Sequence, residues 1–141
     1  MRLETEIRSF FDARGRSLTD PSCLPVLPDA VPFPVYTPQS LSVITDPSAN
    51  ARRVRAVARA FLDLGVTQVR PDILCFSAPS GGRMVVDLRL AHLRDGRPTG
   101  AVSDLTYYLR VRGCCMSTAM LEIVRCPAYA LAEQRGFPRP F

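Results

Sequence analysis

Four stretches of alternating apolar and polar residues occupy the middle of the chain, separated by short glycine-containing turns. They cover residues 69–78, 83–93, 101–112 and 115–126. Alternation with a period of two residues is typical of β-strands with one buried face. Asp95-Gly96 lies between the second and third stretches, and this dipeptide favours a tight hairpin turn. The pattern therefore predicts an antiparallel meander of four strands.

The alternation also assigns side chains to the two faces of this sheet. One face of 83–93 carries Met84, Val86, Leu88, Leu90 and His92, and one face of 101–112 carries Leu105, Tyr107, Leu109 and Val111. In 115–126 both faces are partly apolar, with Ala119, Leu121 and Ile123 on one and Met116, Met120 and Val124 on the other. A strand that is apolar on both sides needs cover on both sides. We therefore expect a homodimer through the sheet face.

Two segments have the 3.6-residue periodicity of amphipathic helices. In residues 1–15 the apolar face carries Leu3, Ile7, Phe10 and Phe11, and Gly15 is expected to end the helix. In residues 47–64 the apolar face carries Val54, Val57, Ala58, Phe61 and Leu62. Asp46 is a suitable N-cap for this second helix, and Gly65 should end it. Its arginines are expected on the solvated face: Arg52, Arg53, Arg55 and Arg59.

The remaining segments are less regular. Residues 16–45 contain six prolines between positions 21 and 38, which exclude a long helix there. We expect an ordered wrapping segment with an edge strand near 35–45. Residues 127–141 form a tail in which 128–134 can make two helical turns. Together these segments predict an α+β fold in a single domain, 1–141, whose bent sheet packs on two helices.

Composition narrows the range of partners. The net charge is +5, and all 18 basic residues are arginine, a bias typical of a GC-rich genome. Because these arginines are spread along the chain and interleaved with acids, we expect no nucleic-acid partner. No apolar run is long enough to cross a bilayer, and the first residues lack the apolar core of a signal peptide. The expected location is therefore the cytoplasm, with no membrane partner.

The five cysteines do not indicate a metal or disulfide site. They are Cys23, Cys75, Cys114, Cys115 and Cys126, an odd number without CxxC spacing. We interpret them as buried thiols of a reducing compartment. The vicinal pair Cys114-Cys115 has a redox or soft-metal alternative. No metal and no cofactor are expected.

The order of elements resembles a known family. The similarity is carried by Phe33-Pro34-Val35-Tyr36, Leu64-Gly65-Val66-Thr67, 83–93 with its Asp95-Gly96 turn, Tyr107-Tyr108-Leu109-Arg110, and 120–124. The chain resembles the cone-shaped α+β family of nuclear transport factor two, ketosteroid isomerase, scytalone dehydratase and the polyketide cyclases, in particular a bacterial branch. The resemblance covers roughly residues 1–130 and implies a conical pocket between sheet and helices.

This resemblance implies a set of pocket-lining residues, namely Phe10, Phe11, Tyr36, Phe61, Leu88, Leu105 and Tyr107. Two features depart from the catalytic members. The first helix offers only Phe10 and Phe11 where the isomerases have a tyrosine, and His92 is the only histidine, whereas the dehydratases use a pair.

Three residues are weak catalytic candidates. Asp104 or Asp87 could act as a general base beside Tyr107 or Tyr36, but cross-strand ion pairs with arginines explain the two acids as well. Simple alternation also places Asp104 and Tyr107 on opposite faces unless a bulge intervenes. His92 lies on the apolar face, where a hydrogen-bonded structural histidine is the simpler interpretation.

Three functions remain open from the sequence. The favoured hypothesis is a protein that binds a small, mostly apolar molecule without catalysis. The alternatives are an isomerase, dehydratase or cyclase that works by proton abstraction, and a protein-interaction module. Fold alone does not decide among them.

Overall fold

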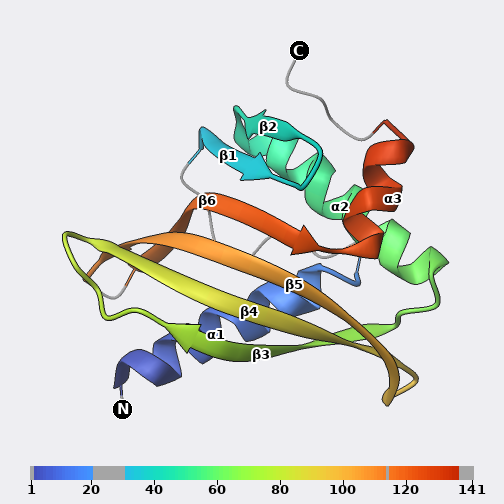
Figure 1. The fold of residues 1–141 in the computed structure, drawn as a ribbon, viewed down its shortest axis with the longest axis horizontal. Helices are drawn as coiled ribbons and strands as arrows, with labels where there is room; N and C mark the ends of the chain where they lie inside the picture. The colour runs from blue at the N-terminus through green and yellow to red at the C-terminus, as the bar shows by residue number, and fades with distance from the viewer. Residues whose placement is uncertain (1, 21–30, 114, 137–141) are drawn as a thin grey trace.

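A computed structural model describes residues 2–20, 31–113 and 115–136, without the side chains of residues 2, 3 and 17. The described elements are α1 (Arg2–Ser17), β1 (Phe33–Tyr36), β2 (Leu41–Ile44), α2 (Pro47–Asp63), β3 (Gln68–Phe76), β4 (Arg83–Arg94), β5 (Arg97–Arg112), β6 (Cys115–Arg125) and α3 (Pro127–Gln134). Figure 1 shows the curved sheet in front, α1 behind β3 and β4, and α2 and α3 towards the upper right.

The six strands form one sheet in the order β2-β1-β6-β5-β4-β3. The meander β3–β6 is antiparallel, as its alternation predicted. In place of one edge strand the structure has two, β1 and β2, which pair with each other. The chain reverses between them in a turn where the Thr37 N–H donates to the Ser40 carbonyl at 2.9 Å. The sheet is mixed rather than wholly antiparallel, since β1 runs parallel to β6.

Bulges bend the long strands. Leu74, Ala119 and Val124 have no partner residue on the neighbouring strand, and the register also shifts beside His92. An extra residue kinks its strand and increases the local twist. Ala119 also changes the phase of β6, so that Met116 and Leu121 both face the core although strict alternation separated them. The inner face of the bent sheet and the helices enclose the core.

α1 packs its apolar face on the sheet, with Ile7, Phe10 and Phe11 buried. The expected end at Gly15 was wrong, because the helix continues to Ser17. Gly15 instead lies against β3, where a Cβ atom would come 3.1 Å from the Pro71 side chain. The glycine therefore allows a close approach between helix and strand.

α2 begins and ends as its capping residues predicted. The Asp46 carboxylate accepts a hydrogen bond from the Ala49 N–H at 2.8 Å. Gly65 follows the helix with φ +79°. The end is reinforced from the sheet, because Arg94 Nε donates to the Gly65 carbonyl at 2.9 Å. A cation at this end also interacts favourably with the helix dipole.

One arginine of α2 is not where it was expected. Arg53 is 5% exposed rather than on the solvated face. Its Nη2 donates to Asn50 Oδ1 at 2.7 Å, and its guanidinium carbon lies 5.6 Å from the centre of the Phe33 ring. The hydrogen bond and the aromatic face offset part of the cost of burying this charge.

Several other expectations concern the loops and the tail. The tail forms a helix, α3, whose Ala128, Tyr129 and Ala132 are buried. Of the three described thiols only Cys126 is buried, so the expectation of buried thiols was wrong for Cys75 and Cys115. Cys23, Cys114, residues 21–30 of the wrapping segment, the last five residues and the side chain of Leu3 lie outside the described part.

Candidate functional site

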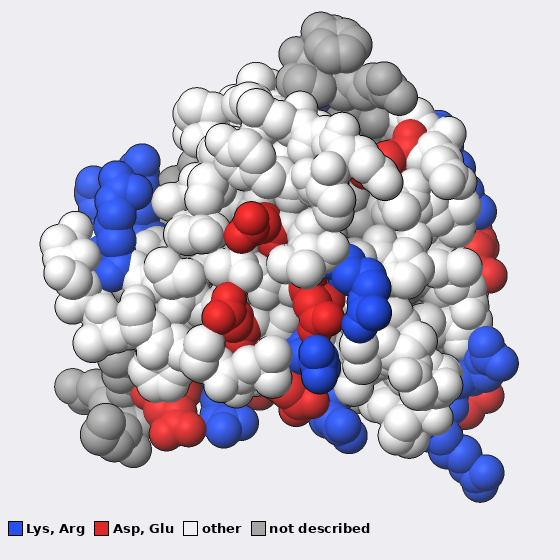
Figure 2. Space-filling model, in the orientation of Figure 1, with Lys and Arg blue, Asp and Glu red and all other residues white. Residues whose placement is uncertain are grey.

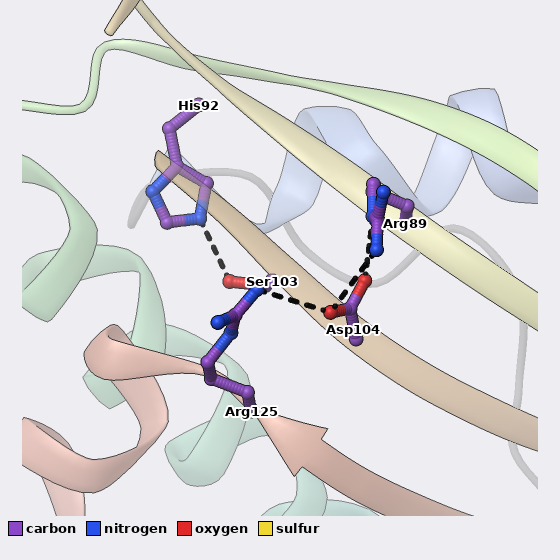
Figure 3. Close-up of polar contacts among 5 residues, drawn as sticks. All are labelled: Arg89, His92, Ser103, Asp104 and Arg125. Atoms are coloured by element: carbon purple, nitrogen blue, oxygen red, sulfur yellow. Dashed lines mark hydrogen bonds and ion pairs between the residues drawn. The ribbon is translucent and has the colours of Figure 1, made fainter. Parts of the chain in front are cut away.

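A polar pair lies on the inner face of the sheet. Alternation along β4 and β5 turns His92 and Ser103 inward, where they are 3% and 0% exposed. His92 Nε2 and Ser103 Oγ are 2.7 Å apart (Figure 3), and Phe61 meets the imidazole edge-on at 5.3 Å between ring centres. The Cys126 thiol also lies beside the Ser103 hydroxyl. The cluster thus joins β4, β5 and the residue that precedes α3.

Burial keeps this cluster neutral. It lowers the pKa of His92 and raises the pKa of the Cys126 thiol, since desolvation disfavours whichever form is charged. A serine beside a neutral histidine resembles an activated nucleophile. Ser103, however, has no exposed surface from which to reach a substrate. The contacts suit a structural histidine that ties three elements together.

This burial predicts a pH-dependent stability. Below about pH 6.5 the unfolded chain protonates His92 while the folded chain resists it. The contribution of neutral His92 to the free energy of unfolding is therefore fully present above this pH and is lost as the pH decreases. Urea unfolding at pH 7.5 and 5 should show this loss, and His92→Gln should reduce it. An equal loss in the variant would contradict the assignment.

The candidate acids lie on the outer face. Asp104 Oδ1 accepts from Arg89 Nε at 2.8 Å, and its Oδ2 lies 3.3 Å from Arg125 Nη2 (Figure 3). Asp87 accepts from the Cys75 thiol at 3.0 Å and from the Thr106 hydroxyl at 2.8 Å. Figure 2 shows charged groups of both signs in the middle of this face.

Both carboxylates are held in the ionised form. The hydrogen bond from Arg89 is the main cause that lowers the pKa of Asp104, and those from Cys75 and Thr106 lower the pKa of Asp87. A general base for carbon acids needs the opposite, a carboxylate whose proton affinity is raised by an apolar pocket. Asp104 therefore has the surroundings of a structural ion pair, whereas Asp87 has neutral hydrogen-bond donors instead of the arginine expected for it.

The structure does not bring Asp104 to Tyr107, and Tyr36 on β1 lies two strands away from Asp104 on β5. Asp104 is paired with Arg89, whereas Tyr107 is paired with buried Val86. The nearest bulge is Val124 on β6, so the phase of β5 stays unchanged between positions 104 and 107. Asp104 and Tyr107 therefore occupy opposite faces, as simple alternation indicated.

Six of the expected lining residues lie in the core. Phe10, Phe11, Phe61, Leu88, Leu105 and Tyr107 are 0–7% exposed. Phe11 packs edge-on against Tyr107, with ring centres 5.0 Å apart. Tyr36 lies instead on the outer face with 40% exposure, because its neighbour Val35 points inward. The lining of a pocket by these residues stays a prediction.

Sequence reasoning did not identify three further features. On the inner face of the sheet, the Arg14 guanidinium carbon lies 5.6 Å from the centre of the Tyr107 ring. Thr118 Oγ1 is buried on the inner face without a hydrogen-bond partner. An open groove of about 530 Å³ lies between the end of α1 and β3, with Asp12 and Arg70 among its lining residues. Only tertiary packing creates this groove, so no local pattern indicated it.

The described residues offer neither a metal-binding cluster nor a membrane-spanning helix. Within residues 2–20, 31–113 and 115–136, no group of three or more His, Cys, Asp or Glu side chains could hold a metal ion. No helix in these ranges combines the length and apolar character that crossing a bilayer requires.

Comparison with known proteins identifies the fold. No protein-family model matches the chain, and no curated protein matches it significantly. An NTF2-like protein with a cystatin-like fold from Novosphingobium aromaticivorans superposes with a TM-score of 0.62 at 13% identity, over 93% of this chain and 86% of that one. An NTF-2-like protein of unknown function from Shewanella oneidensis gives 0.61 at 8% identity, over 86% and 98%. A protein of unknown function from Mycobacterium tuberculosis gives 0.61 at 8% identity, over 96% and 91%. The chain therefore has the cone-shaped α+β fold of the NTF2-like proteins, as the resemblance in its sequence predicted.

Proposed function

We propose that this chain is a non-catalytic interaction module that pairs with a second copy through the outer face of its sheet. One observation carries the proposal. Four apolar side chains are exposed on the outer side of β1, β2 and β6, namely Tyr36, Leu41, Val43 and Val124, which are 40%, 55%, 38% and 55% exposed. A group of large apolar side chains exposed on one side of a sheet marks an interaction site.

The charges on this face are compatible with burial in an interface. Asp104 already has two arginine partners, and Asp87 has two hydrogen-bond donors. Covering carboxylates that keep these ion-pair and hydrogen-bond partners avoids the costly case, a buried charge without any partner. These acids therefore do not prevent a second copy from docking on the neighbouring apolar patch.

The candidate acids and the histidine do not favour catalysis. Asp87 and Asp104 are ionised and face away from the core, whereas His92 is neutral and buried. Proton abstraction needs a base and an oxyanion donor on the same side of one substrate.

A cytoplasmic setting is part of the proposal, and the exposed thiols Cys75 and Cys115 suit a reducing compartment.

Two leucines of equal exposure provide the test. Leu41 on edge strand β2 and Leu74 on edge strand β3 are both 55% exposed. By light scattering at micromolar concentration we expect the wild type to be a dimer, Leu41→Asp a monomer, and Leu74→Asp a dimer. Circular dichroism would verify that both variants are folded. A monomeric wild type, or two variants that behave alike, would refute the pairing.

Binding of a small, mostly apolar molecule inside the cone is the second candidate function. The buried Thr118 hydroxyl favours it, because an inner-face polar atom without a partner is a natural contact for a ligand. Mass analysis of the intact protein distinguishes the two candidates.

A further inference from the structure

Three arginines meet at one corner of the outer face. Arg83 begins β4, Arg110 lies directly opposite it on β5, and Arg112 follows two residues later on the same face. All three are exposed, while the neighbours Met84 and Leu109 point into the core. In Figure 2 basic side chains gather at the left edge, where Figure 1 places the β3–β4 and β5–β6 turns. We call Arg83, Arg110 and Arg112 the arginine corner.

These arginines have no acidic partner in the described part of the chain. None of the three forms an ion pair or a side-chain hydrogen bond with another described residue. Five other arginines form ion pairs, namely Arg8, Arg70, Arg89, Arg125 and Arg135, and what distinguishes the corner is that three unpaired arginines lie together on one face. The corner is thus a local excess of positive charge.

The arrangement is unfavourable for the isolated sheet. Like charges directly opposite each other on antiparallel strands repel, and Arg83 and Arg110 are such a pair. A local conflict without compensation inside the fold is typical of a functional site. An anion bound from outside would remove the repulsion and use the guanidinium groups as paired donors.

The surroundings restrict the form of this anion. The next cross-strand pair towards the middle of the sheet is Val85 opposite Tyr108, and Val85 is 36% exposed. Beyond it lie Asp87 and Asp104. A long polyanion that crosses the sheet would meet these carboxylates, whereas a short segment would not.

We propose that the arginine corner binds a short acidic peptide segment of a partner protein. Its carboxylates would contact the three arginines, and an apolar side chain of the segment would lie on Val85 and Tyr108. This site does not depend on pairing through Leu41, and it can hold whether or not the chain dimerises.

The test uses fluorescence anisotropy with a labelled peptide of alternating glutamate and phenylalanine, and its glutamine counterpart as the uncharged probe. We expect the glutamate peptide to bind and the glutamine peptide not to bind. Arg110→Glu should weaken binding at least about tenfold, because it removes one cation and adds a repulsive charge. The variant should still fold, since an acid opposite Arg83 is a favourable cross-strand pair.

Arg97→Glu is the matched control. It makes the same charge change at the other end of β5 and should alter the affinity less than about twofold, as expected for a distant exposed charge. If both variants weaken peptide binding equally, the effect depends only on net charge, and the proposed site is overturned. The proposal also fails if the wild type does not bind the glutamate peptide. Tighter binding to oligothymidylate or to phosphatidylserine vesicles than to this peptide would likewise overturn it, in favour of a nucleic acid or a membrane.

Discussion

Phe11→Ala is expected to lower the free energy of unfolding by about 3–5 kcal/mol, the usual cost of truncating a buried phenylalanine. Phe11 is 1% exposed and makes edge-on contacts with both Phe10 and Tyr107. It thus connects α1 to the inner face of β5. The loss combines removal of apolar surface from the core with the cavity that remains.

Phe76→Ala provides a control with the same change of side chain. Phe76 is 38% exposed at the end of β3, and its truncation should cost less than about 1 kcal/mol. Urea unfolding of both variants should be measured at one protein concentration, because dimerisation makes stability concentration-dependent. Similar midpoints for Phe11→Ala and Phe76→Ala would contradict the packing of α1 inside the cone.

Gly65→Ala is expected to cost about 2–3 kcal/mol, the next largest effect. Gly65 has φ +79°, a conformation that alanine adopts only with strain. A Cβ atom there would also collide with the Arg94 guanidinium. The substitution would therefore break the hydrogen bond from Arg94 that ends α2.

A double-mutant cycle separates the two contributions. Arg94→Ala should be less damaging in the Gly65→Ala background than alone, because the collision and the hydrogen bond disappear together. Gly136→Ala tests backbone strain by itself, since Gly136 has φ +77° but no atom within 4 Å of a Cβ. Purely additive losses at Gly65 and Arg94 would show that the two residues do not interact.

Short-range patterns predicted most of the fold. Hairpin turns and alternation were sufficient for β3–β6, and Asp46 and Gly65 marked the ends of α2 within one or two residues. The bulges were not predicted, because an extra residue such as Ala119 depends on how two strands pair. Arg53 was wrongly expected on the solvated face because it is charged. Its spacing indicated the buried face, since it lies four residues before buried Val57.

The candidate site was predictable only in part. Alternation correctly separated Asp104 from Tyr107 and placed His92 inside. The same rule would have placed Tyr36 on the outer face, opposite the pocket that the resemblance implied. It would also have placed Ser103 on the inner face, beside Leu105. The contacts among His92, Ser103 and Cys126 depend on the curvature of the sheet and on the start of α3, which local sequence does not specify.

Native mass spectrometry of the purified wild-type protein tests the central claim most directly, because it reports stoichiometry and bound ligand in one measurement. The proposed interaction module predicts a species of twice the chain mass with no added small molecule. A monomer that carries a small molecule would contradict it, and would favour a ligand inside the cone.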